Sequence, residues 1–101
     1  MAKERHHNLI DETIHQRTRL AIMAALAGVE SLDFNELKAE LGLTDGNLST
    51  HASALERAGY IRITKSFRGR KPRTTLRMTA KGRKAMENYI NLLQGILDKA
   101  K

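Results

Sequence analysis

Two short stretches of helical apolar periodicity, joined by a turn at Gly42, restrict the folds open to this 101-residue chain. The first stretch begins at Asp33, which stands three residues before Glu36 as in a capping box. The second begins after Thr44, a good N-cap residue, and is predicted to run to about Ala58. Because glycine tolerates the left-handed conformation in which helices commonly end, Gly42 suits the turn between them. The sequence therefore predicts two successive helices joined by a tight turn.

The segments around this helix pair predict a small α+β fold that is mostly helical. We expect a helix over about 8–27, kinked near His15–Arg17, two strands within 60–78 that flank a turn at 68–72, and a last helix over 79–100. Two helices joined by a short glycine-containing turn form a helix-turn-helix, here over 33–58, and a hairpin after them makes a wing. The predicted fold is a winged helix-turn-helix with a three-helix core, a β-hairpin wing, and N-terminal and C-terminal dimerisation helices.

The composition is that of one globular domain covering residues 1–101, with 41% hydrophobic and 29% charged residues. The chain has no cysteine, which excludes disulfides and thiolate metal sites. No apolar run approaches the ~20 residues of a membrane span. The polar N-terminus lacks the apolar core of a signal peptide. We therefore expect a cytoplasmic protein with no membrane partner.

Positive charge is concentrated in the second half of the chain. The net charge is +7 and the pI is about 10.2, which favours polyanionic partners. The stretch 57–84 contains no acidic residue and eleven of the 18 Lys and Arg residues, namely Arg57, Arg62, Lys65, Arg68, Arg70, Lys71, Arg73, Arg77, Lys81, Arg83 and Lys84. A solvated surface normally mixes both signs, so a block of one sign on a hairpin after a helix-turn-helix is typical of a nucleic-acid binder.

Short polar side chains on the second helix of the pair are candidates for DNA contacts. Such side chains allow close approach to a major groove, whereas serine and threonine add little to helix stability. The candidates are Thr44, Asn47, Ser49, Thr50 and Ser53, with His51 near the same face. On the wing, the candidates for phosphate neutralisation are Lys65, Arg68, Arg70, Lys71 and Arg73, which we expect to lie together without a counter-charge. The alternatives are an ordinary solvated helix face and a hairpin with incidental charge.

The last predicted helix carries an apolar stripe that is wider than a two-position seam. Its members are Met86, Ile90, Leu93 and Leu97, at the spacing i, i+4, i+7 and i+11, and the stripe is widened by Tyr89, Leu92 and Ile96. The helix is about five turns long, so we expect its distal half to extend past a small core. A second copy of the chain would cover this stripe together with Leu9, Ile10 and Ile14. The alternative is packing on the chain's own core.

No pattern in the sequence indicates catalysis or a bound cofactor. There is no glycine-rich phosphate loop, and no set of serine, histidine and acid in a recognisable context. The four histidines, at positions 6, 7, 15 and 51, have no acidic cluster at ligand spacing, which favours structural or solvated roles. We therefore expect a protein that is not an enzyme and that binds no metal.

The segments 43–51, 55–61 and 67–74 together resemble the small prokaryotic winged-helix transcription regulators related to MarR and ArsR. The resemblance implies a homodimer whose recognition helices enter successive major grooves, while the wings reach adjacent minor grooves or the backbone. By position, it assigns the major-groove role to Asn47, Ser49, Thr50, His51 and Ser53, and the wing role to Arg68, Arg70, Lys71 and Arg73. The cysteine ligands of ArsR-type sensors are absent, so metal sensing is not implied, and an effector stays unassigned.

The sequence thus predicts a dimeric transcription regulator of the repressor type, which binds specific sequences of double-stranded DNA at the nucleoid. An RNA-binding or translation-associated winged helix and a protein-interaction winged helix remain the alternatives. RNA-binding modules usually add exposed aromatic side chains for base stacking. The only aromatic residues are Phe34, Tyr60, Phe67 and Tyr89. We expect most of the four to be buried, which favours duplex DNA.

Overall fold

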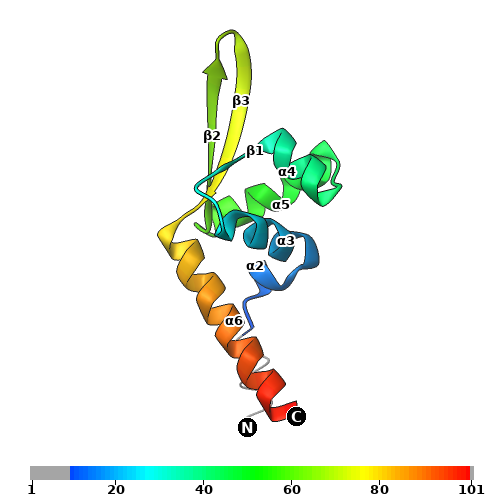
Figure 1. The fold of residues 1–101 in the computed structure, drawn as a ribbon, viewed down its shortest axis with the longest axis vertical. Helices are drawn as coiled ribbons and strands as arrows, with labels where there is room; N and C mark the ends of the chain where they lie inside the picture. The colour runs from blue at the N-terminus through cyan, green and yellow to red at the C-terminus, as the bar shows by residue number, and fades with distance from the viewer. Residues whose placement is uncertain (1–9, 101) are drawn as a thin grey trace.

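The computed structural model describes residues 10–100, in which a cluster of helices lies at the base of a long β-hairpin (Figure 1). In chain order the elements are α2 (Glu12–His15), α3 (Arg17–Ala27), β1 (Leu32–Asp33), α4 (Phe34–Leu41), α5 (Asp45–Arg57), β2 (Ile61–Arg68), β3 (Lys71–Met78) and α6 (Ala80–Ala100). The hairpin of β2 and β3 extends from one end of the cluster and α6 from the opposite end. The predicted fold class, α+β and mostly helical, is confirmed.

Side-chain caps define the two helices of the central pair, as predicted. Asp33 and Glu36 form a capping box at the start of α4, in which Glu36 Oε1 accepts a hydrogen bond from the Asp33 backbone N–H at 3.1 Å. Gly42 ends α4 with φ of +65°, a conformation that glycine adopts without strain. Thr44 begins α5, and its Oγ1 accepts a hydrogen bond from the Asn47 backbone N–H at 3.1 Å.

The predicted single helix over 8–27 is wrong, because the described part of it forms two helices. Gln16 separates α2 from α3 with an extended backbone, at φ −66° and ψ 132°. Its side chain starts the second helix, because Gln16 Oε1 accepts a hydrogen bond from the Arg19 backbone N–H at 2.8 Å. Asp11 caps α2 through bonds from the backbone N–H groups of Thr13 and Ile14. The predicted kink thus lies where expected, but it is a complete break.

The three strands form one antiparallel sheet in the order β1-β3-β2. The hairpin register runs from the pair Ile61 and Met78 to the pair Arg68 and Lys71. The turn is therefore Gly69-Arg70 and is shorter than the predicted turn at 68–72. Gly69 has φ of +66°, which suits the first position of a two-residue hairpin turn.

The sheet contains one strand that the sequence analysis did not predict. β1 is only two residues long, and it exists through pairing of Leu32 with Leu76 and of Asp33 with Thr75. β1 does not reach Pro72, which pairs with Phe67 on β2. Proline has no backbone N–H to donate, so a place beyond the end of the neighbouring strand suits it.

The core lies between the helices and the inner half of the hairpin. Its buried members are Ile14, Ile22, Met23, Leu26, Leu37, Leu48, Ala52, Leu55, Ile61, Leu76, Met86 and Tyr89. They come from α2 to α6 and from both long strands. Beyond Tyr89, α6 continues away from the cluster (Figure 1). Among residues 10–100, no helix combines the length and the apolar character that crossing a membrane requires.

A close backbone contact joins the start of α6 to the end of α5. Thr79 Oγ1 donates to the Gly59 carbonyl at 2.6 Å and accepts from the Gly82 backbone N–H at 3.0 Å. The Thr79 backbone N–H donates to the Tyr60 carbonyl at 3.0 Å. Gly82 is buried against Tyr60, and a Cβ at position 82 would lie 2.0 Å from the Tyr60 carbonyl oxygen. Only glycine fits there without a backbone shift.

The Gly82→Ala variant should therefore be less stable than the wild type by about 1–3 kcal/mol or more, the usual cost of overpacking. Gly95→Ala on the same helix is the matched control, since its added Cβ meets no atom within 4 Å. That control should gain about 0.5–1 kcal/mol, because alanine is the better helix former. Urea unfolding followed by circular dichroism measures both values. Equal stability of the two variants would contradict the close contact at Gly82.

Candidate nucleic-acid interface

The buried face of α5 orients its polar face toward solvent. Leu48 and Leu55 are fully buried, and Ala52 is 1% exposed, so these three side chains fix the rotation of the helix. The polar residues that result on its surface are Asn47, Ser49 and Thr50, which are exposed, and Ser53, which is half-buried. The structure thus brings these four predicted contact residues onto one helix, at the surface.

Two other predicted contact residues of this helix have partners within the chain. Thr44 uses its hydroxyl oxygen as the N-cap of α5, where it accepts the bond from Asn47. His51 is half-buried, and its Nδ1 lies 3.5 Å from Nη1 of Arg19 on α3. These two side chains lie beside the polar face of α5, but internal contacts restrain them.

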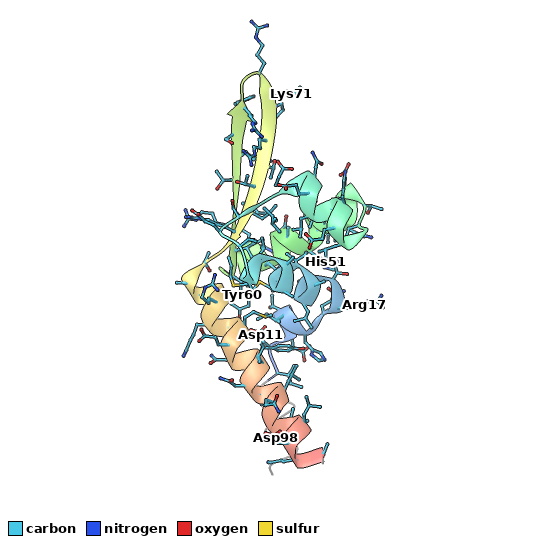
Figure 2. All side chains as sticks on the ribbon, in the orientation of Figure 1. Asp11, Arg17, His51, Tyr60, Lys71 and Asp98 are labelled. Carbon is cyan, nitrogen blue, oxygen red and sulfur yellow. The ribbon has the colours of Figure 1, made fainter. Side chains whose placement is uncertain are left out.

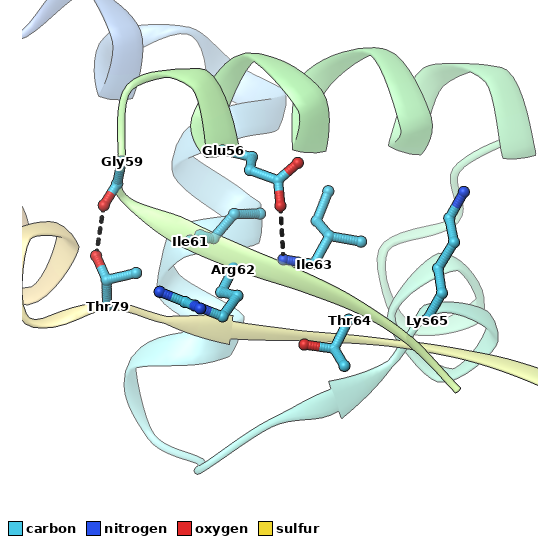
Figure 3. Close-up of a pocket in the computed structure, with 8 residues that line it drawn as sticks. All are labelled: Glu56, Gly59, Ile61, Arg62, Ile63, Thr64, Lys65 and Thr79. Atoms are coloured by element: carbon cyan, nitrogen blue, oxygen red, sulfur yellow. Dashed lines mark hydrogen bonds between the residues drawn. The ribbon is translucent and has the colours of Figure 1, made fainter. Parts of the chain in front are cut away.

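Four of the five predicted basic residues of the wing are exposed. Lys65 lies on the face of β2 that is turned toward α5, next to Ile63 and Ile61 (Figure 3). Arg68, Arg70 and Lys71 surround the turn, and Lys71 lies near the outer end of the hairpin (Figure 2). The cations of the wing therefore extend from the side of α5 to the tip.

The fifth predicted basic residue, Arg73, is not free of a counter-charge, which corrects the expectation for the wing. Its Nε lies 3.4 Å from Oδ2 of Asp33, and its side chain is half-buried. The pair forms because β1 places Asp33 beside β3, opposite Thr75. Part of the Arg73 charge is thus compensated within the chain, and its guanidinium is held on the hairpin face that turns away from Lys65.

A hollow of about 410 Å³ separates α5 from the wing. Its lining comes from α4, α5, β2 and β3, namely Phe34, Ser49, Ala52, Ser53, Glu56, Ile63, Lys65 and Thr74. Two hydroxyl groups of α5 and the ammonium group of Lys65 border the same space. This combination of neutral donors with one cation can bind an anionic oxygen by hydrogen bonds and charge.

The carboxylate at the edge of this hollow is engaged with the wing. Glu56 Oε2 accepts a hydrogen bond from the Ile63 backbone N–H at 3.0 Å, as the dashed line in Figure 3 marks. That bond satisfies a backbone donor on the outer side of β2, where no strand of residues 10–100 lies beside it. Glu56 thereby fixes the hairpin to α5 and sets the spacing of the two surfaces.

A basic residue that the sequence analysis missed flanks the other side of α5. Arg17 and Thr18, in the first turn of α3, line a second hollow of about 330 Å³ together with Asn47. Arg17 lies in the first turn of α3, where the helix dipole makes a cation unfavourable, so its charge does not stabilise the helix. No signal in the sequence pointed to Arg17, because the break at Gln16 was expected only as a kink within one helix and the first turn of α3 was therefore not visible.

Part of the predicted dimer stripe is already covered by the chain's own core. Ile14, Met86 and Tyr89 are 0%, 8% and 5% exposed. This corrects the expectation that they lie in an interface with a second chain, because they are buried within one chain. Ile90 and Leu97 are 53% and 57% exposed, and the half-buried members are Ile10, Leu93 and Ile96. Leu9 lies outside the described residues.

Two tyrosines link α5 and α6 to the N-terminal segment. The Tyr60 hydroxyl donates to Asp11 Oδ2 at 2.5 Å. Burial, together with this bond and the nearby Asp11 charge, raises the pKa of Tyr60 to about 12. The Tyr89 hydroxyl lies 2.8 Å from Nδ1 of His15. Because Tyr60 keeps its proton at neutral pH, the link from Asp11 to the start of the wing holds.

Comparison with known proteins gives the same architecture. A relative from Methanocaldococcus jannaschii, the uncharacterized protein MJ0432, is 44% identical over 72 residues, which are 71% of this chain and 78% of that protein. The solved structure of a transcriptional regulator homologue from Pyrococcus horikoshii OT3 superposes with a TM-score of 0.85, at 28% identity and over 90% of each chain. The YusO protein from Bacillus subtilis gives 0.74 at 17% identity, over 98% of this chain and 72% of that one.

The fold is a winged helix, in which α4 and α5 are the helix-turn-helix and β2 and β3 are the wing. Residues 18–97 match the family described as "Winged helix DNA-binding domain". The chain belongs to this family, whose members are transcription regulators rather than enzymes. The structural neighbours include MarR-family regulators and the ArsR-like HlyU from Vibrio cholerae, which confirms the resemblance seen in the sequence.

Proposed function

We propose that this protein is a dimeric regulator that binds specific sequences of double-stranded DNA through α5 and the wing, and that it represses transcription by occupying its site. The observation that carries the proposal is the hollow bordered by Ser49, Ser53 and Lys65, which separates a polar helix face from a basic hairpin. One sugar-phosphate strand separates a major groove from the next minor groove. With α5 in the first groove and the wing at the second, that strand crosses the hollow.

The roles of the side chains follow from their lengths and charges. Asn47, Ser49 and Thr50 are short and exposed near the start of α5, where a recognition helix contacts base edges. Arg68, Arg70 and Lys71 are long and charged, and they suit phosphates along the neighbouring groove. A further candidate for a phosphate contact is Arg17, on the opposite flank of α5.

The distal half of α6 supports a dimer with two-fold symmetry. Ile90 and Leu97 are seven residues apart on one face of the helix, and both are more than half exposed. Leu93 lies between them on the same face and is half-buried. Pairing of this face with that of a second copy removes apolar surface from water. It also presents two copies of α5 to one duplex.

A second candidate function is binding of single-stranded RNA. Phe67 is 74% exposed on the wing, which makes it the exception among the four aromatic residues, most of which were expected to be buried. An exposed ring next to cations can stack on an unpaired base. The winged-helix family and the polar face of α5 favour duplex DNA, and a titration with both nucleic acids separates the two functions.

Neutralising the wing tip should weaken binding to every duplex. We expect the double variant Arg70→Gln and Lys71→Gln to reduce the log–log salt slope by about 1 for each lost phosphate contact. The matched control is Lys84→Gln with Lys99→Gln, which removes the same charge from α6. Fluorescence anisotropy over a series of salt concentrations measures both variants. Equal slopes for the tip variant and the wild type would mean that the tip contacts no phosphate.

The Asn47→Ala variant should lose sequence preference more than affinity. We expect a cost of roughly 1–3 kcal/mol on the preferred site, and far less on random DNA, where binding rests on phosphate charge. The preferred site comes from selection with genomic fragments, and we expect a near-palindrome with half-sites about one helical turn apart. Asn91→Ala, on the exposed surface of α6, is the control. Equal losses on both duplexes would restrict Asn47 to backbone contacts.

Charges placed on the exposed face of α6 should separate the dimer. We expect the double variant Ile90→Glu and Leu97→Glu to be monomeric, because unpaired carboxylates are costly to bury. Both side chains are more than half exposed within the chain, so its own fold should persist. Asn91→Glu adds a charge at an exposed polar position of the same helix and should stay dimeric. A specific dimer should form at protein concentrations on the order of tens of micromolar. A wild type that sediments as a monomer at such concentrations would refute the dimer.

A further inference from the structure

Phe67 on the wing has no place in the core. It is 74% exposed, while Tyr89 is 5% exposed and Phe34 and Tyr60 are half-buried. Among the described residues, Phe67 is thus the one aromatic side chain that lies mostly in water. Neither the hairpin turn nor the predicted phosphate contacts require a ring at this position.

The ring is part of a small apolar tip on one face of the hairpin. Phe67 pairs across the strands with Pro72, and the next pair toward the core is Lys65 with Thr74. Alternation along β2 puts Phe67 on the same face as Ile63 and Lys65, which is the face turned to α5 (Figure 3). The apolar tip and the polar face of α5 are therefore presented on the same side of the molecule.

The apolar tip is narrow, and the residues around it are strongly basic. Arg68, Arg70 and Lys71 lie within four residues of Phe67, and no acidic residue occurs between Glu56 and Glu87. The turn that closes the tip has only two residues, so the end of the hairpin is as slim as a hairpin allows. A ring surrounded by cations does not suit an apolar protein groove. It suits a polyanion with an apolar interior, and a base-paired duplex is one.

We propose that Phe67, backed by Pro72, is an apolar wedge that enters the minor groove beside the site of α5, partly unstacks one base step and bends the duplex. The proposal rests on the proposed function, because the wing must already lie along double-stranded DNA. Phenylalanine and proline are among the side chains that open base steps from the minor groove, with kinks of about 20–90°. Such opening is easiest at flexible TA and CA/TG steps. The wedge therefore adds preference for those steps without any hydrogen bond to a base.

A tryptophan at the tip reports the stacking directly. The wild type has no tryptophan, so Phe67→Trp gives a single reporter. Ser66→Trp is the matched control, because the neighbouring side chain is exposed and points to the opposite face of the same strand. The probe is a dye-labelled duplex with TA steps in every helical turn. We expect the bound duplex to quench the fluorescence of the tryptophan at 67 strongly and that of the tryptophan at 66 only slightly. The anisotropy of the dye verifies that both variants are compared at the same saturation with duplex.

The bend gives a second and independent measurement. Energy transfer between dyes at the two ends of the same duplex should show a bend with the wild type and with Phe67→Leu. It should show a clearly smaller bend with Phe67→Ser. Leucine keeps an apolar wedge, whereas serine removes it without a change in charge. A complex in which serine bends DNA as much as phenylalanine overturns the proposal.

The remaining outcomes separate the wedge from the proposed function. Duplex binding without extra quenching at position 67 overturns the wedge and leaves the proposed function intact. Quenching by a single-stranded RNA of mixed sequence, without any by the duplex, overturns the wedge and favours the RNA-binding alternative. Absence of binding to any duplex at low salt overturns both proposals.

Discussion

The arrangement of α5, the wing and α6 depends on the junction between Thr79 and the backbone at Gly59 and Tyr60. Two hydrogen bonds, of 2.6 and 3.0 Å, hold Thr79 to these carbonyl groups. The absence of a side chain at Gly82 lets α6 approach the same backbone. Since α5 ends, the hairpin starts and α6 begins within this junction, it fixes the directions of all three. A shift here would move the wing, α5 and the exposed face of α6 relative to one another.

Local signals in the sequence were sufficient for the helix-turn-helix. The Asp33 and Glu36 capping box, the left-handed Gly42 and the Thr44 cap each act within a few residues, so they can be read without the fold. The break at Gln16 was visible only as a kink. A glutamine that caps a helix with its own side chain is not a common start signal.

The features that the sequence analysis missed depend on contacts between distant residues. β1 exists only because Leu32 meets Leu76, and the same pairing brings Asp33 to Arg73. The alternation that buries Ile61 also put Phe67 on the inner face, but the hairpin extends beyond the core before that position. The pattern of a strand gives the face of a side chain, whereas the extent of the core decides its burial.

The central claim is that α5 and the wing bind one duplex together, in adjacent grooves. The most direct test combines guanine methylation interference with hydroxyl-radical footprinting on the preferred site. Methylation at N7, in the major groove, should block binding within each half-site. Sugars across the neighbouring minor groove should be protected where the wing lies. Protection confined to one groove, or binding that major-groove methylation does not affect, would contradict the claim.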